Sequence, residues 1–191
     1  MAVAQQRMSE QEYELFVQSH PDGQWELHDG VLVEKPGMTW RHLDISYELG
    51  RHLGNQLDRS EYRVFVEGRA RRPTDTIFIP DVMIVPIAYG AEFVDSTRLA
   101  IFSNPLPLVV EVWSPSTGSY DIETKIPVYR QRGDADIWNI HPFDQTLGRS
   151  VRQPDGSYVE SVHRGGVVTL AALPWVEVDL DRLFDTGFPS E

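Results

Sequence analysis

The chain contains no cysteine among its 191 residues. Disulfide bonds, thiolate metal ligands and cysteine-based catalysis are therefore excluded. The sequence also has neither a glycine-rich phosphate-binding loop nor a Gly-x-Ser-x-Gly turn. These absences argue against the common nucleotide-binding folds and against serine hydrolases. Any catalytic chemistry has to come from other groups, above all carboxylates and lysines.

Long apolar stretches are missing as well. No run approaches the roughly 20 apolar residues that a membrane helix needs, and residues 1–7 lack the apolar segment of a signal peptide. Together with the missing cysteines, these features predict a cytoplasmic protein without a membrane segment. No linker-like stretch or internal repeat divides the sequence, so we expect a single domain over residues 1–191.

Positive charge is scarce. Lysine and arginine total 17 against 29 aspartates and glutamates, which gives a formal net charge of −12. Proteins that bind nucleic acid through a broad basic face need many phosphate contacts, so this balance argues against a constitutive DNA-binding protein. A nuclease whose acidic centre is masked by a cation is not excluded.

The one dense basic stretch covers residues 68–73. In a strand, Arg69 and Arg71 would point to the same face and could contact a phosphate backbone. An edge strand that uses charge to block aggregation is at least as good an interpretation.

Apolar periodicity predicts an α+β or α/β fold, a central mixed sheet flanked by helices and preceded by a helix and a hairpin. Ser9 and Glu12 form a capping-box pattern at the start of the first helix. We interpret Trp40, Trp113 and Trp138 as core residues. The expected helices cover about residues 9–18, 39–57, 120–131 and 180–184, and the expected strands about 63–67, 76–85, 108–113, 136–140 and 167–170, with hairpins at 28–30 and 154–156.

Two of the predicted strands carry a carboxylate in an apolar setting: Asp81 and Glu111. Burying an unpaired carboxylate costs several kcal/mol, so such groups are paired, protonated or bound to a cation. Neighbouring strands lie about 4.8 Å apart, which lets two acids share one ion. Their oxygen ligands suit Mg²⁺ or Mn²⁺. In the alternative interpretation, each acid caps a turn or pairs with an arginine.

A lysine follows in the predicted helix. Lys125 could orient a nucleophile or offset transition-state charge, and a divalent cation lowers the pKa of water and polarises phosphoryl oxygens. Asp121 lies one turn earlier and could pair with Lys125, or it could complement the helix dipole. Glu123 and Lys125 also form a literal acid-x-lysine pair, but a helix would point them about 200° apart.

An ordered set of motifs resembles the Uma-type family of restriction-endonuclease-like proteins, within the PD-(D/E)xK nuclease superfamily. Its sharpest member is the Glu-Val-x-Ser-Pro-Ser-Thr run that begins at Glu111. Residues 26–30 look like the family's N-terminal hairpin, and residues 136–142 are similar to its tryptophan strand. The full set is Pro80-Asp81, then Glu111-Val112-Trp113-Ser114-Pro115-Ser116-Thr117, then Asp121 and Lys125.

The resemblance implies a restriction-endonuclease-like fold and Mg²⁺- or Mn²⁺-dependent hydrolysis of phosphodiester bonds, with DNA as the expected substrate. Because Trp113 stands where the plain superfamily motif has its lysine, Lys125 is the implied lysine. The implied roles are metal ligation by Asp81 and Glu111 with the Val112 carbonyl as a third ligand, an extra acid at Glu26, and supporting positions at Asp121 and His42.

One departure from the family pattern affects these expectations. His141 stands where the family usually has an aspartate before the proline. Two rival functions therefore stay open. The first is an inactive module that works through protein association, with a homodimer as the expected assembly. The second is a metal hydrolase that acts on a small phosphorylated molecule.

Overall fold

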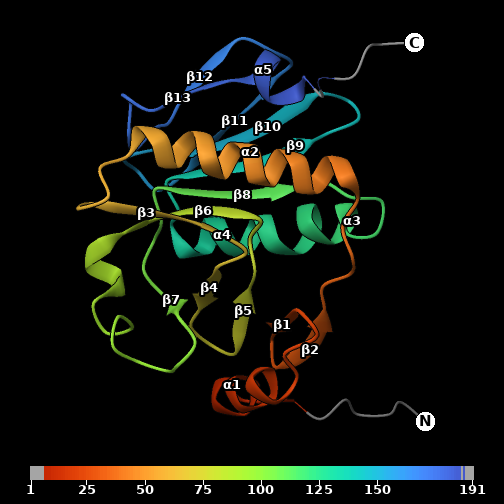
Figure 1. Ribbon diagram of the computed structural model, residues 1–191, viewed down its shortest axis with the longest axis vertical. Helices are drawn as coiled ribbons and strands as arrows, with labels where there is room; N and C mark the ends of the chain where they lie inside the picture. The colour runs from red at the N-terminus through yellow and green to blue at the C-terminus, as the bar shows by residue number, and fades with distance from the viewer. Residues whose placement is uncertain (1–6, 186, 188–191) are drawn as a thin grey trace.

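The computed structural model describes residues 7–185 and 187, and its centre is a six-stranded mixed sheet (Figure 1). The strand order is β11-β10-β9-β8-β6-β3. Among the described residues, only the β8–β9 pair of this sheet is parallel. The predicted mixed sheet is therefore confirmed. Its strands are β3 (Tyr62–Val66), β6 (Val82–Pro86), β8 (Leu108–Val112), β9 (Asp136–His141), β10 (Thr146–Arg152) and β11 (Tyr158–His163).

Helices cover both faces of this sheet (Figure 1). On one face lies α2 (Trp40–Gln56), whose buried residues Ile45, Leu49 and Leu53 recur every four positions, as the predicted stripe requires. Thr39 caps this helix. On the other face a helical run comprises α3 (Gly118–Tyr120), the π-helical turn η2 (Asp121–Lys125) and α4 (Ile126–Arg132). Burying one such aliphatic side chain stabilises the folded state by about 1.5–3 kcal/mol, and this burial holds the helices against both faces of the sheet.

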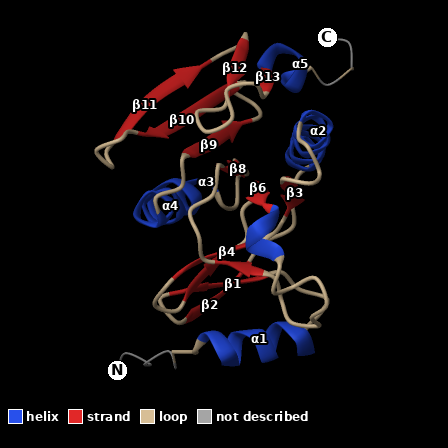
Figure 2. Cartoon of the chain, turned by 90° about the vertical axis from the view of Figure 1, so that its left-hand side faces the viewer, coloured by secondary structure: helices blue, strands red, loops and turns tan. Residues whose placement is uncertain are grey.

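A second sheet of five strands lies below the first and is covered by α1 (Glu10–Ser19) (Figure 2). The Ser9–Glu12 capping box is present, and Tyr13 and Val17 pack against Leu27. The N-terminal helix and the hairpin after it are confirmed. The strand order is β2 (Val31–Glu34), β1 (Trp25–His28), β5 (Thr76–Phe78), β4 (Arg69–Arg72) and β7 (Ile101–Phe102).

The C-terminal part packs on α2. A two-stranded ladder, β12 (Val167–Thr169) and β13 (Glu177–Asp179), leads into α5 (Leu180–Phe184), and its apolar side chains join the core cluster that contains Leu49 and Trp138. A single 3₁₀ turn, η1 (Ile87–Gly90), follows β6. No helix in the described part of the chain is both long and apolar enough to cross a membrane.

The single strand predicted over residues 76–85 is two strands. β5 belongs to the smaller sheet and β6 to the larger one. Pro80 has no N–H to donate to a ladder, so pairing stops there and the chain turns from one sheet into the other. This turn forms the corner at which the candidate site lies.

Two other expectations needed correction. Trp40 was predicted to be core but is 71% exposed, because it is the first residue of α2 and lies outside the buried stripe; Trp138 is fully buried. The helix predicted over residues 120–131 begins earlier and contains the π-helical turn. Pro127 lies near the first position of α4, where a missing N–H is tolerated.

Candidate active site

The corner between the sheets brings two carboxylates side by side. In the β6–β8 register Val82 faces Val110, so Asp81, one residue earlier, faces Glu111. The Asp81 N–H donates to the Val110 carbonyl at 3.0 Å. Both carboxylic side chains are only 1–2% exposed. The shared register, rather than sequence proximity, is what makes them neighbours.

Asp81 is surrounded by hydrogen-bond donors. The Lys35 ammonium lies 2.7 Å from Oδ1, the His42 Nε2 atom lies 3.0 Å from Oδ2, and the Val112 N–H donates to Oδ2 at 2.6 Å. Burial by itself would raise the pKa of Asp81, but Lys35 and His42 together hold that pKa well below its usual range. Asp81 is therefore a carboxylate throughout the physiological pH range.

Glu111 lies in a different environment. Tyr129 donates its hydroxyl to Oε1 at 2.5 Å, and the Lys125 ammonium lies 3.3 Å from Oε2. Burial raises the pKa of Glu111, Lys125 opposes this, and the nearby carboxylates of Asp121, Asp81 and Glu26 raise it further, so the net pKa is well above its usual value. Without an added positive charge, Glu111 tends to hold a proton.

Lys125 lies among three carboxylates. Its Nζ atom is 2.9 Å from Glu26 Oε1, 3.1 Å from Asp121 Oδ1 and 3.3 Å from Glu111 Oε2. Burial works against the charged amine, yet these carboxylates raise the pKa of Lys125 well above its ordinary value. The π-helical turn carries both Asp121 and Lys125 to the sheet, and such turns recur at functional sites.

Glu26 connects the smaller sheet to this group. It lies in β1 and is 2% exposed. Besides its contact with Lys125, its Oε1 atom accepts the Ile79 N–H at 2.8 Å. The predicted extra acid is therefore in direct contact with the predicted lysine, although the two belong to different layers of the fold.

Lys35 is the residue that sequence reasoning missed. It follows β2, its side chain is 3% exposed, and its Nζ atom also contacts the Ile79 carbonyl at 3.1 Å. Asp81 and Glu111 raise the pKa of Lys35 despite the opposing effect of burial. A lysine at the end of a hairpin strand is ordinarily solvated, so no signal in the sequence marks this one as buried.

These residues form one buried acid–lysine cluster. With Glu111 ionised along with the other three acids, the four carboxylates and two ammonium groups have a formal charge of −2. That deficit matches one divalent cation. The cluster consists of Asp81, Glu111, Glu26, Asp121, Lys35 and Lys125.

The donor set suits a hard cation with few protein ligands. In the parts of the chain that the structure describes, no three His, Asp or Glu side chains are arranged to hold a metal ion. Mg²⁺ needs only one or two carboxylates, with waters and substrate phosphate completing its shell. Asp81 and Glu111 meet that requirement. Val112 contributes its N–H to Asp81, and metal ligation by its carbonyl stays a prediction.

Other residues named from the sequence lie outside the cluster. Arg69 donates to the Tyr13 hydroxyl at 3.2 Å, and Arg71 lies 2.7 Å from Glu10, so both of these arginines contact α1. Glu123 is exposed on the helical run. These placements favour Glu111 over Glu123 as the acid that belongs with Lys125.

His141 has a structural role in the turn after β9. Its ring stacks on Trp113 with centroids 4.2 Å apart, and its Nδ1 atom accepts the Asp144 N–H at 3.0 Å. Gly118 lies directly against Trp113, where an added Cβ would be 1.8 Å from the indole nitrogen. His141 therefore caps this turn through its ring nitrogen.

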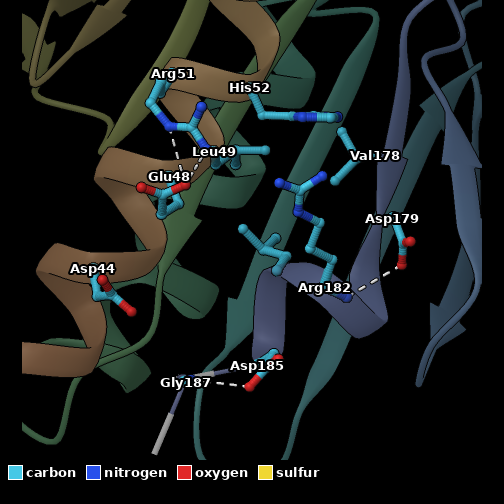
Figure 3. Close-up of a pocket in the computed structure, with 11 residues that line it drawn as sticks. Asp44, Glu48, Leu49, Arg51, His52, Val178, Asp179, Arg182, Asp185 and Gly187 are labelled. Carbon is cyan, nitrogen blue, oxygen red and sulfur yellow. Dashed lines mark hydrogen bonds and ion pairs between the residues drawn. The ribbon is translucent and has the colours of Figure 1, made fainter.

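The pocket shown in Figure 3 lies away from the acid–lysine cluster. It has a volume of about 360 Å³ and lies between α2 and α5, with Glu48, Arg51 and Arg182 among its lining residues. Of the described residues that line it, none belongs to the acid–lysine cluster. It therefore lends no support to a small-molecule phosphohydrolase that works through the cluster.

The layered mixed sheet with a helix on each face is a nuclease-like fold. It is similar to the crystal structure of a "putative nuclease belonging to DUF820" from Anabaena variabilis, with a TM-score of 0.70 and 19% identity over 84% of this chain and 89% of that chain. The chain belongs to the Uma2 family, described as "Putative restriction endonuclease", whose model matches residues 10–181. No curated protein matches the chain.

Proposed function

We propose that this protein is a Mg²⁺- or Mn²⁺-dependent nuclease that hydrolyses phosphodiester bonds in DNA. The observation that supports the proposal best is the pairing of Asp81 with Glu111 at the sheet corner, with the Lys125 ammonium 3.3 Å from Glu111. The family membership and the nuclease-like fold support a nuclease in general. The metal, the substrate and the residue roles are the proposal.

Asp81 and Glu111 would hold the cation, which when bound supplies electrophilic stabilisation of a phosphate oxygen and a more acidic water. The Lys125 ammonium would exchange its contact with Glu111, the longest of its three at 3.3 Å, for a hydrogen bond to the attacking water or to a non-bridging oxygen, and so offset charge that develops in the transition state. Glu26 and Asp121 fix the position of the Lys125 amine through their contacts at 2.9 and 3.1 Å.

His42 and the Val112 N–H fix the second oxygen of Asp81. These donors keep the Asp81 carboxylate ionised and hold its orientation. Because the cluster is almost fully buried, a scissile phosphate reaches it only when the covering side chains are displaced.

The test is nicking of supercoiled plasmid DNA with Mg²⁺ or Mn²⁺ and with EDTA. Asp81→Asn and Lys125→Ala should each lower the cation-dependent rate by on the order of 100-fold or more, because each removes a charged group from the reacting centre. Glu123→Gln is the matched control, since it removes an exposed acid from the same helical run. Nicking that persists in EDTA, or survives both substitutions, would contradict the proposal.

A second candidate is a module that acts through protein association. Three exposed apolar side chains of α2 favour it: Trp40 at 71%, Leu43 at 53% and Tyr47 at 63%. Their spacing places them along one side of the helix. Absence of any nicking, together with loss of self-association on Tyr47→Ser in light scattering, would favour this function over hydrolysis.

A further inference from the structure

Lys35 holds the one oxygen of Asp81 that a metal ion could use. An ionised carboxylate offers about four lone-pair sites, two on each oxygen. On Asp81, Oδ2 already accepts from His42 and from the Val112 N–H, while Oδ1 accepts only from Lys35, at 2.7 Å. A cation that binds Asp81 must therefore approach Oδ1, next to the Lys35 ammonium.

The two lysines of the cluster differ in this respect. Lys125 is shared among three carboxylates, and Asp121 and Glu26 continue to hold it whatever binds Glu111. Lys35 has Asp81 as its close carboxylate partner. An ammonium and a divalent ion on the same oxygen repel each other strongly at a buried site. Metal binding at Asp81 therefore requires Lys35 to move.

A second carboxylate lies within reach of Lys35. Glu67 Oε1 is 3.8 Å from the Lys35 Nζ atom, and its side chain is 32% exposed. Glu67 is held at this corner because its N–H donates to the Asp81 carbonyl at 3.1 Å and Gln24 donates to its Oε2 atom. Its backbone is left-handed, with φ of 59°, a conformation that a non-glycine residue keeps only under external constraint.

We propose that Lys35 is a built-in competitor of the metal ion, bound to Asp81 when no divalent cation is present and transferred to Glu67 when one binds. The inference rests on the proposed metal site and deepens it. Lys35 then sets the cation concentration at which the site fills, because each binding event has to displace an ammonium. Glu67 makes that displacement easier by receiving it.

The test is calorimetric titration of Mn²⁺ into the metal-free full chain, which needs no measurement of activity. Lys35→Met keeps the length of the side chain and removes its charge, so it should tighten Mn²⁺ binding by about tenfold, equivalent to about 1.4 kcal/mol. Glu67→Gln removes the receiving carboxylate and should weaken binding by about threefold. Arg98→Met controls for the loss of a surface charge and should stay within about twofold of wild type.

The outcomes separate this inference from the proposed function. If wild type binds Mn²⁺ and Lys35→Met binds equally or more weakly, the competitor role is wrong and the metal site stands. If neither protein binds Mn²⁺, both proposals are wrong. If Lys35→Met binds and wild type does not, the competitor role is supported in its strongest form. Should metal-free Lys35→Met fail to fold, Glu67→Gln decides, because binding equal to or tighter than wild type overturns the inference.

Discussion

The two carboxylates at the sheet corner are neighbours, each contacts one lysine, and their acidities shift in opposite directions. The pKa of Asp81 lies well below its usual range, whereas the pKa of Glu111 lies well above. Burial is nearly the same for both, so it does not explain the difference. The cause is the ratio of positive donors to carboxylates around each one.

On the Asp81 side, one carboxylate receives an ammonium, an imidazole and a backbone N–H. On the Glu111 side, one ammonium serves three carboxylates. The charge of Asp81 is therefore balanced by its own donors, whereas the three carboxylates around Lys125 carry more negative charge than one ammonium can balance. A divalent cation placed between them would correct the second side, which is the physical reason the pair suits a metal better than either residue would alone.

The largest expected effect comes from removing each lysine in turn. Lys125→Met leaves three buried carboxylates without their cation and should lower the free energy of unfolding by about 3–5 kcal/mol. Lys35→Met leaves Asp81 with two donors and should cost about 1–3 kcal/mol. Urea denaturation in EDTA measures both. Equal costs would show that the two sides of the cluster are not as different as their contacts indicate.

The pH dependence of stability should separate the two acids. Because folding raises the pKa of Glu111, its ionisation costs stability, which falls as the pH rises above about 4.5 toward the folded-state pKa, by about 1.4 kcal/mol per pH unit for one group. Glu111→Gln should remove that fall. The contribution of Asp81 has the opposite sign: it is present above about pH 3.8 and is lost on acidification.

Thermal unfolding between pH 4 and pH 8 in EDTA checks this. The difference between wild type and Glu111→Gln should grow as the pH rises, whereas the stability lost in Asp81→Asn should be nearly constant over this range, because it shrinks only as the pH falls to about 3.8 and below. A wild-type curve parallel to that of Glu111→Gln would show that Glu111 titrates normally in the folded protein.

Effects no larger than that of Lys35→Met should come from the side-chain donors that are not lysines. Tyr129→Phe removes the hydroxyl that donates to Glu111 Oε1 and should cost about 1–3 kcal/mol, since that oxygen has no other donor among the described residues. His42→Leu should cost less, about 1 kcal/mol, because Asp81 Oδ2 keeps the Val112 N–H. The buried His42 Nδ1 atom, which has no partner in the described structure, would be removed as well. If urea denaturation shows that His42→Leu loses more stability than Tyr129→Phe, then Asp81 depends on its side-chain donors more than Glu111 does, contrary to this expectation.

Much of this arrangement could be predicted from local patterns. The α2 stripe, the Ser9 cap and the turn at Asp29 and Gly30 are short-range features, and both turn residues have the positive φ angles that the turn needs. Asp81 and Glu111 stood out because a carboxylate in an apolar run needs an explanation. The sequence did not predict that these two residues face each other, because that register depends on strand pairing across 29 intervening positions.

What could not be predicted came from tertiary placement. Lys35 ends a hairpin strand whose neighbours look ordinary, and only the packing of the smaller sheet against the corner buries it. The prediction for Trp40 failed in the opposite direction. Its apolar ring suggested a core residue, but at the start of α2 the side chain is exposed to solvent. Burial at the ends of elements is decided by neighbours that are distant in sequence.

The cluster draws on both sheets, and this affects the order of its assembly. Glu26 and Lys35 come from the first hairpin, whereas Glu111 and Lys125 enter the chain some 75–100 positions later. During synthesis, the ribosome must release the helical run around Lys125 before the early hairpin finds its partners. A partly made chain thus holds its acids apart in water, and any cutting activity would have to wait until translation has passed the point where the layers can close.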